Sequence, residues 1–282
     1  MPASFSVRAP ASSANLGPGF DSLALALDLW LHASVTRTAT GEIRDVGSVD
    51  LLGGVNLVIE AMTMTARRLG VTLPGCDITV SSDIPVARGL GSSAAAIVAG
   101  IRAAGELAGV ELPLAQIVDI GGEMEGHADN VSAAVLGGVT VAAHTAVGYV
   151  ADVLVASLPW RAVVFIPHSH SLTKDARDVL PALVPLRDAA ANIGRGVLLA
   201  HALRSHRSDL VREGMVDFLH QPYRAEIFQH LEPAIAAALH AGAIGACLSG
   251  AGPSVLALAS AACAEGVGVA MTDASGLAGV DG

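Results

Sequence analysis

The spacing of hydrophobic and polar positions along the chain predicts alternating strands and helices. Short runs in which the two kinds alternate, or which are apolar throughout, are typical of strands, and apolar residues three and four apart are typical of helices. The strands expected on this basis are residues 5–8, 23–36, 76–81, 139–142, 150–156, 162–166, 245–248 and 254–258. The helices expected are residues 58–69, 94–108, 114–124, 131–136, 174–179, 189–203, 209–218 and 231–241.

This pattern of elements restarts in the middle of the chain, around Pro159. We therefore predict a boundary near residue 155, with one domain over residues 1–155 and a second over residues 156–282. Strands and helices are mixed in both domains, so the expected fold class is α/β (α+β). The final stretch, MTDASGLAGVDG, is rich in small residues, and we expect it to be frayed.

Composition narrows the functions that such a fold could serve. Hydrophobic residues make up 52% of the 282 positions but aromatic residues only 3%, so the core must be built from small aliphatic side chains. The net charge of −10 argues against nucleic acid or an anionic membrane as a partner. The longest apolar region is interrupted by Arg102 and Glu106, and the first ten residues lack the apolar core of a secretory signal. We therefore expect a cytoplasmic protein without a membrane span.

The sequence PVARGLGSSAAA, residues 85–96, is the strongest local signal. An expected strand precedes it and an alanine-rich helix follows, which is typical of a phosphate-binding loop, because glycines let the backbone approach an anion and the amides of a helix start attract it. Lys174 is the only lysine of the chain, so phosphate binding would rest on backbone amides, a metal and arginine. Taken alone, the loop could equally contain a serine that caps a buried helix.

Two further glycine- and serine-rich segments lie far from this loop, ASSANLGPGFD at residues 11–21 and LSGAGPS at residues 248–254. In this order, the three segments resemble the three motifs of the GHMP kinases, the superfamily of galactokinase and of homoserine, mevalonate and phosphomevalonate kinases. The segments EGHADNV, TKDAR, NIGR and LHQPYR are similar to segments of the homoserine kinases in particular. The resemblance covers nearly the whole chain, from residue 5 to about residue 258.

The resemblance implies a two-domain GHMP kinase fold, with an N-terminal nucleotide domain like domain 2 of ribosomal protein S5 and a ferredoxin-like C-terminal domain. It implies ATP-dependent phosphorylation of the side-chain hydroxyl of L-homoserine, with ATP, Mg²⁺ and this amino-acid alcohol as partners, and it leaves a homodimer open. Two alternatives remain: another GHMP kinase that acts on mevalonate or a sugar, and a non-catalytic ligand sensor of the same fold. The sensor would be expected to have lost Ser93 or Glu123, and both are present.

For the nucleotide, the resemblance assigns residues to the metal, the phosphates and the nucleoside. Ser93 and Glu123 would hold Mg²⁺, which takes few protein oxygens and completes its shell with phosphates and water. Glu125, by contrast, is expected to be an exposed carboxylate at a helix end. The expected ATP-binding residues are Pro85, Val86, Ala87, Arg88, Gly89, Leu90, Gly91, Ser92, Ser93, Ala94, Ala95, Asn56, Gly250 and Gly252.

For the acceptor, the resemblance assigns groups of opposite charge. Asn15 and Asp21 match positions that hold the substrate ammonium. Arg177 and Arg224 match arginines that grip the α-carboxylate, which suits the bidentate geometry of a guanidinium. The alternative is that Asn15 and Asp21 only form turns beside glycines, and that Arg177 pairs with a neighbouring aspartate of its own helix.

The expected catalytic residues are His127, Asn130 and Thr173. His127 and Asn130 match positions at the acceptor hydroxyl and the substrate carboxylate, and Thr173 matches one near the transferred phosphoryl group. Asp129 has no clear role, although mevalonate kinases use an aspartate of the matching region as a base. Because phosphoryl transfer through a loose transition state depends more on positioning and charge neutralisation than on proton removal, we predict that no strong general base is needed.

Overall fold

The structure is a computed structural model that describes residues 4–49, 56–171 and 173–282, with the backbone alone at residues 173–175. Its contacts divide the chain into two compact units. Unit 1 comprises Met1–Ser12, Leu25–Val86 and Gly91–Asp152. Unit 2 comprises Ser13–Ala24, Ala87–Leu90 and Val153–Gly282, so it includes two short segments from the N-terminal half of the chain.

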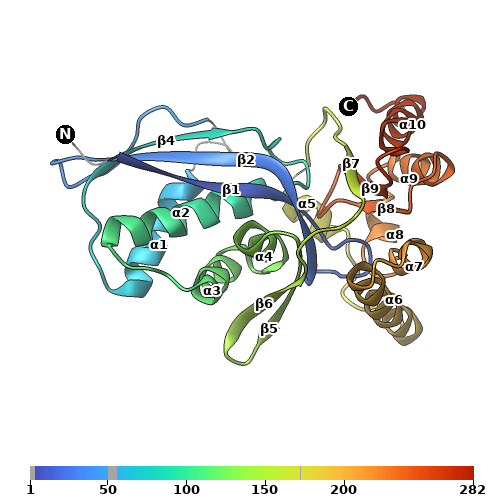
Figure 1. The fold of residues 1–282 in the computed structure, drawn as a ribbon, viewed down its shortest axis with the longest axis horizontal. Coiled ribbons are helices and arrows are strands. Elements are labelled where there is room, and N and C mark those ends of the chain that lie inside the picture. The colour runs from blue at the N-terminus through green and yellow to red at the C-terminus, as the bar shows by residue number, and fades with distance from the viewer. Residues whose placement is uncertain (1–3, 50–55, 172) are drawn as a thin grey trace. The chain divides into compact units, whose positions relative to one another are not determined.

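Among the described residues, six strands, mostly of unit 1, form one sheet (Figure 1). They are β1 (Ser4–Ala14), β2 (Leu23–Arg37), β3 (Ile43–Asp45), β4 (Cys76–Ser82), β5 (Val139–Thr145) and β6 (Gly148–Val155). The order is β3-β4-β2-β5-β6, with β1 beside β2. Along β2, which pairs antiparallel with β4, buried Leu31, Ala33 and Val35 alternate with exposed residues, so one face of the strand enters the core.

Four helices of unit 1 lie on one face of this sheet (Figure 1). They are α1 (Leu57–Leu69), α2 (Ser92–Ala108), α3 (Leu114–Glu125) and α4 (Asp129–Leu136). α2 is the central helix and contacts the other three. Most of its alanines, such as Ala96, Ala99 and Ala103, are fully buried, which agrees with the expectation of a core made of small aliphatic side chains.

Unit 2 contains a three-stranded antiparallel sheet in the order β7-β9-β8, made of β7 (Arg161–Phe165), β8 (Gly245–Leu248) and β9 (Val255–Ala259). Its helices are α5 (Thr173–Asp178), α6 (Leu186–Arg204), α7 (Ser208–Gly214), α8 (Gln221–Arg224), α9 (Leu231–His240) and α10 (Ala264–Leu277). α9 and α10 pack on the sheet (Figure 1). The core between them includes Phe165, Leu231, Leu248 and Met271.

Several parts of the chain depart from the expected elements. The prediction of a frayed C-terminus was wrong, because α10 continues to Leu277 and buries Val267 and Met271 against the sheet of unit 2. This burial outweighs the low helix propensity of its glycines. The helix expected over residues 209–218 ends at Gly214. β3 and α8 were not expected, because elements of three and four residues are too short to show a hydrophobic period.

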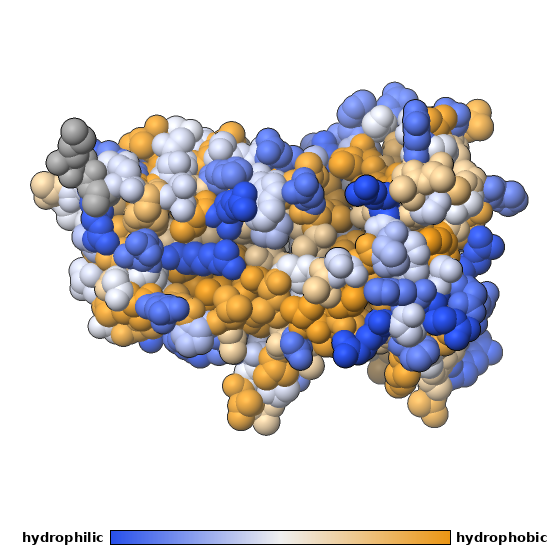
Figure 2. Space-filling view, viewed as in Figure 1, coloured by the Kyte–Doolittle hydropathy of each residue, from blue (hydrophilic) through white to orange (hydrophobic). Residues whose placement is uncertain are grey.

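The surface mixes polar and apolar residues. Among the described residues, no helix combines the length and the apolar character needed to cross a bilayer. Figure 2 shows hydrophobic residues at the tip of the β5–β6 hairpin, where Val147 is 88% exposed. Single exposed apolar side chains of this kind are common on folded proteins.

Candidate active site

The first glycine-rich segment forms a tight loop in unit 2. Asn15, Leu16, Gly17 and Asp21 have φ angles of 69°, 49°, 87° and 53°, a region that residues with a side chain rarely adopt. The side-chain oxygen of Asn15 accepts a hydrogen bond from the amide of Asp21 at 3.0 Å, and its side-chain nitrogen donates to the carbonyl of Gly250 at 3.0 Å. Since Asn15 is only 3% exposed, its side chain holds this loop in shape.

Parts of all three glycine-rich segments meet within unit 2. The hydroxyl of Ser249 contacts the hydroxyl of Ser13 at 2.8 Å and the carbonyl of Gly89 at 2.7 Å. The amide of Gly250 donates to the carbonyl of Ala14 at 3.1 Å. Gly89 has a φ of 74°, and a Cβ at this position would lie 2.2 Å from the carbonyl oxygen of Ser249. The close approach of the second and third segments therefore requires glycine at this position.

The phosphate loop continues into unit 1 at Gly91, the residue before α2. Gly91 has a φ of 67°, and a Cβ there would lie 2.2 Å from the hydroxyl oxygen of Ser12. α2 then begins with Ser92 and Ser93, has no acidic residue in its first turn, and receives no capping hydrogen bond from a side chain. The alternative of a serine-capped helix is thus not what the structure contains, and the uncapped amides are suited to an anion.

The other residues expected to bind phosphate have varied surroundings. Arg88 donates from Nε to the carbonyl of Pro167 at 2.8 Å and from Nη2 to that of His168 at 2.5 Å, so its guanidinium is engaged by the backbone of unit 2. Ala87 has a φ of 54°, which extends the run of positive φ angles along the loop. Half-buried Pro85 and Val86 precede it, whereas Leu90, Ala94 and Ala95 are buried, and Gly252 has a φ of 90°.

The start of α4 gathers three polar side chains in unit 1. Nδ1 of His127 lies 2.7 Å from the carboxylate of Asp129, which also accepts the backbone amide of Asn130 at 2.7 Å. The side-chain oxygen of Asn130 accepts a hydrogen bond from the hydroxyl of Ser12 at 2.9 Å. His127 and Asn130 are therefore close together, as expected, and Asp129, 2% exposed, holds the imidazole.

Two glutamates at the end of α3 differ sharply in environment. Both oxygens of Glu123 accept hydrogen bonds from Nη1 of Arg68, at 2.8 and 2.7 Å, and the Glu123 side chain is 38% exposed. The Glu125 side chain is only 12% exposed, and its Oε2 lies 3.9 Å from Nε2 of His127. The expectation that Glu125 is an exposed helix-end carboxylate was wrong, because the last turn of α3 turns this residue inward beside the start of α4.

Asp21 and Arg177 form an ion pair in unit 2. Nη2 of Arg177 donates to Oδ1 of Asp21 at 2.6 Å and Nη1 donates to Oδ2 at 3.2 Å, and the two side chains are 37% and 34% exposed. The ring of Phe20 lies beneath the guanidinium, with its centroid 5.4 Å from Cζ. Arg177 thus pairs with a residue 156 positions away and not, as the alternative held, with an aspartate of its own helix.

Arg224 is held quite differently, although it lies in the same unit. It is 1% exposed, and its Nε donates to the carbonyl of Ala176 at 3.0 Å. Its Nη1 lies 3.1 Å from the carbonyl oxygen of Gly250 and 3.2 Å from Nδ1 of His220. The centroid of the Phe20 ring is 5.6 Å from its Cζ. We call the five residues Phe20, Asp21, Arg177, His220 and Arg224 the arginine cluster.

The two remaining assignments concern Asn56 and Thr173. Asn56 caps α1, since its side-chain oxygen accepts the amides of Val58 and Ile59. Its side-chain nitrogen donates to Asp45 at 2.7 Å. Burial alone would raise the pKa of Asp45, but the hydrogen bond from Asn56 and others from Ser48 and Gly47 lower it to about 2. Thr173 begins α5, and its side chain lies outside the described part of the chain.

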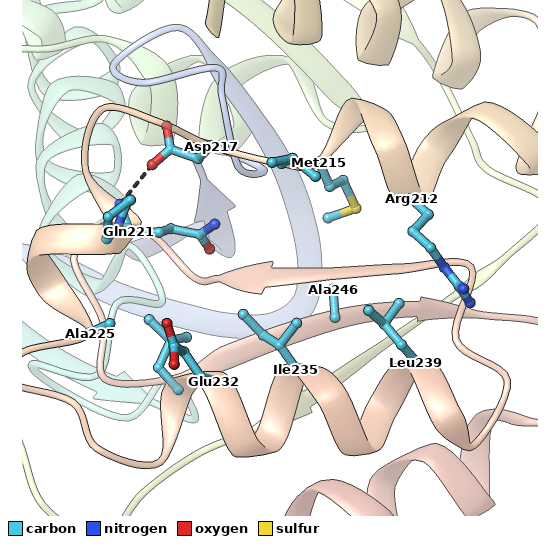
Figure 3. A pocket seen from close by; sticks show the side chains of 12 residues that line it. Arg212, Met215, Asp217, Gln221, Ala225, Glu232, Ile235, Leu239 and Ala246 are labelled. Carbon is cyan, nitrogen blue, oxygen red and sulfur yellow. Dashed lines mark hydrogen bonds between the residues drawn. The ribbon is translucent and has the colours of Figure 1, made fainter. Parts of the chain in front are cut away.

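Sequence reasoning did not identify His220 or Phe20 as members of the site. Both lie inside segments that resemble those of the GHMP kinases, LHQPYR and ASSANLGPGFD. Only a spatial contact relates them to the arginines. A cavity of about 250 Å³ beside α8 was also not expected (Figure 3). Ile235, Leu239 and Met215 point into it, and none of the residues assigned from the sequence lines it.

Comparison with known proteins identifies the family. The family model of the GHMP kinases N terminal domain matches residues 56–138, and the model of the GHMP kinases C terminal region matches residues 199–274. The homoserine kinase of Desulfitobacterium hafniense is 40% identical over 272 residues, which are 95% of this chain and 91% of that protein. The homoserine kinase of Deinococcus radiodurans is 42% identical over 255 residues, 89% of this chain and 83% of that protein.

Solved structures agree with this result. The crystal structure of homoserine kinase from Cytophaga hutchinsonii has a TM-score of 0.87 and 29% identity, and the match covers 98% of this chain and 92% of that one. Mevalonate kinase from L. major, at 17% identity and a TM-score of 0.72 over 96% of this chain and 91% of that one, has the same fold. The chain therefore belongs to the GHMP kinases, and within them to the homoserine kinases.

Proposed function

We propose that the chain transfers the γ-phosphoryl group of ATP to the side-chain hydroxyl of L-homoserine, giving O-phospho-L-homoserine and ADP. Relatives named homoserine kinase match it over nearly its full length. The observation that carries the acceptor is the ion pair of Asp21 and Arg177. A zwitterionic amino acid offers one ammonium and one carboxylate, and this pair supplies one partner of the opposite charge to each. ATP is supplied in the cytoplasm, where we expect the enzyme to act.

The ion pair can be exchanged for substrate because it is partly exposed. A pair of this exposure contributes little to stability, so opening it costs little. The ammonium of homoserine would then take the place of Arg177 beside Asp21, and its carboxylate the place of Asp21 beside Arg177. A neutral sugar would desolvate both charges without offering either a new partner, which is unfavourable.

The nucleotide would bind with its phosphates at the uncapped start of α2. Unit 1 supplies donors that suit Mg²⁺, because the hydroxyl of Ser93 and a carboxylate at the end of α3 are hard oxygen ligands. Glu125 is a better candidate than Glu123, since Arg68 already engages both oxygens of Glu123. The bound ion would neutralise charge on the β- and γ-phosphates.

At the acceptor, His127 and Asn130 would orient the hydroxyl. Since Nδ1 of His127 is bonded to Asp129, Nε2 is the ring atom that would meet the hydroxyl. Asp129 accepts hydrogen bonds from His127 and from the Asn130 amide, so we assign it to orientation and not to proton removal. The hydroxyl oxygen forms its bond to the γ-phosphorus as the bond to the β–γ bridging oxygen breaks, and the hydroxyl proton leaves on the transferred phosphoryl group.

The direct test is ADP formation with four candidate acceptors, L-homoserine, L-threonine, mevalonate and galactose, with the phosphorylated product identified by ³¹P NMR. We expect kcat/KM to be highest for L-homoserine. Faster phosphorylation of mevalonate or galactose would contradict the acceptor and leave the kinase reaction intact. Absence of phosphorylation of every acceptor, with ATP still bound, would favour the ligand sensor.

A further inference from the structure

His220 is a fully buried histidine that links the first glycine-rich loop to Arg224. Its Nε2 lies 2.8 Å from the carbonyl oxygen of Gly17, and its Nδ1 lies 3.2 Å from Nη1 of Arg224. A carbonyl only accepts and a guanidinium only donates, so Nε2 must carry the ring hydrogen and Nδ1 must accept. The contacts are therefore compatible with one neutral tautomer of the imidazole.

The position of the ring is fixed on its other sides as well. The amides of His220 and Gln221 donate to Oδ2 of Asp217 at 2.8 and 2.6 Å, which holds the start of α8, and Figure 3 shows the second of these bonds. Oδ2 of Asp217 lies 3.7 Å from Nε2 of His220. The ring of Phe20 stacks on the imidazole, with centroids 5.2 Å apart and planes at 26°. His220 therefore has little freedom to adopt another orientation.

The burial of His220 favours the neutral form of its ring. Burial lowers its pKa most, and the cation of Arg224 lowers it further, whereas Asp217, the Gly17 carbonyl and Asp21 act in the opposite direction without reversing the shift. The thiol of Cys247, which also faces Asp217 and Gly17, has a raised pKa because of its burial and is neutral. Protonation of Nδ1 would place a hydrogen and a positive charge against the guanidinium of Arg224.

We propose that His220 is a positioning residue for homoserine binding, whose neutral imidazole sets the orientation of Arg224 and ties it to the Gly17 loop. The proposal rests on the proposed function, because the quantity it controls is the affinity for homoserine. It predicts that removal of the acceptor at Nδ1 raises the KM for homoserine, since Arg224 then loses one of the contacts that orient it. The folded protein also loses stability below about pH 6.5, because the unfolded chain takes up a proton that buried His220 resists.

The test compares two substitutions that each keep one half of the link. In His220→Asn, the amide oxygen can accept from Arg224 near the position of Nδ1, but the contact with Gly17 is lost. In His220→Gln, the amide nitrogen can donate to Gly17 near the position of Nε2, but the acceptor for Arg224 is lost. We expect the KM for homoserine to rise roughly thirtyfold in His220→Gln and within about threefold in His220→Asn, with the KM for ATP unchanged in both.

A matched control is His230→Gln. His230 is 2% exposed, its Nε2 lies 2.8 Å from the Pro253 carbonyl, and burial lowers its pKa. Its ring neighbours are Phe165 and Phe228, which lie outside the arginine cluster. We expect this variant to lower the melting temperature without raising the KM for homoserine.

The outcomes separate this proposal from the proposed function. If the wild type phosphorylates homoserine but His220→Gln has the wild-type KM and only melts earlier, His220 is a structural residue and the proposal is wrong. If the wild type does not phosphorylate homoserine, the proposed function is wrong. Nitrogen-15 NMR of the histidine rings then decides the His220 geometry independently of activity: a neutral ring with hydrogen on Nε2 at pH 7 is expected, and a charged ring or hydrogen on Nδ1 would overturn it.

Discussion

Two short helices of unit 2, α5 and α8, each contribute an arginine to the same cluster and hold it in opposite ways. Arg177 on α5 is 37% exposed at its side chain and is bonded to the carboxylate of Asp21. Arg224 on α8 is 1% exposed and is bonded to backbone carbonyls and to an imidazole. Both guanidinium groups lie within 5.6 Å of the Phe20 ring centroid.

The difference indicates a division of labour between the two charges. A partly exposed ion pair can exchange its partner for a ligand at little cost, so Arg177 is suited to direct contact with substrate. A buried cation that already donates to three acceptors is costly to move, so Arg224 is suited to supporting the loops that surround the substrate. The sequence resemblance assigned both arginines to the α-carboxylate of the substrate, but the two side chains differ in burial.

The largest effect is expected for Arg224→Ala. The substitution removes the Arg224 donor from the carbonyl of Ala176 and from Nδ1 of His220, and leaves the carbonyl of Gly250 with Asn15. The free energy of unfolding should therefore fall by about 3 kcal/mol, and kcat/KM for homoserine by about a thousandfold. Chemical denaturation and steady-state kinetics measure the two quantities. An Arg224→Ala protein with wild-type stability would show that this guanidinium does not support the loops around the substrate.

The two glutamates of α3 offer the same comparison in unit 1. Glu125→Gln should lower kcat about a hundredfold at saturating Mg²⁺, because it removes a buried carboxylate suited to the metal, whereas Glu123→Gln should remain within about threefold. Titration of Mg²⁺ at fixed ATP checks both. A hundredfold loss of kcat in Glu123→Gln alone would identify Glu123 as the metal ligand, as the sequence predicted. It would also mean that Arg68 releases Glu123 when the metal binds.

Arg177→Ala should change specificity more than stability. We expect the KM for homoserine to rise about fiftyfold, with the KM for ATP unchanged and the melting temperature within 2 °C of the wild type, because a half-exposed ion pair contributes about 0–1 kcal/mol. Arg207→Ala is a matched control, since Arg207 forms an exposed pair with Asp209 at 2.6 Å elsewhere in unit 2. Equal homoserine KM values in both variants would contradict the contact of Arg177 with substrate.

The smallest effect is expected for Phe20→Leu. The ring contributes about 0.5–1 kcal/mol to each cation that it faces, and leucine retains most of the packing. The KM for homoserine should therefore rise about threefold, and Arg177→Ala combined with Phe20→Leu should show less than the product of the two effects. A multiplicative result in this double-mutant cycle would mean that Phe20 acts only through α8.

The long elements of the fold could be predicted from the sequence because their periodicity reports burial directly. β2, α1 and α3 begin and end within one or two residues of the expected limits. β1 was expected to end at Arg8 but continues to Ala14, because the buried hydroxyls of Ser12 and Ser13 make contacts that no hydrophobic pattern reveals. α10 was missed for the same reason, since tertiary packing and not local propensity forms it.

The sequence proposed which residues form the candidate site, but not which of their side chains contact one another. The glycine-rich loop and the arginines were identified from local sequence, whereas the partner of Arg177 is 156 positions away. The environment of Glu125 was predicted wrongly, because helical spacing does not say which of two neighbouring carboxylates meets Arg68 and which turns toward His127. Glu123 as a metal ligand stays a prediction. Thr173 stays a prediction.

The contact of Asn15 with Gly250 has a consequence for folding during synthesis on the ribosome. The two residues are 235 positions apart, so the loop that contains Asn15 is synthesised long before its partner Gly250. Contacts of this separation form slowly, because a long stretch of chain must close around them. Unit 1 can form most of its own strands and helices while translation continues, but Arg224 cannot form its bond to the Gly250 carbonyl before the residues that follow β8 have been released. A chain that stops short of Gly250 would therefore lack the carbonyl that accepts from both Asn15 and Arg224.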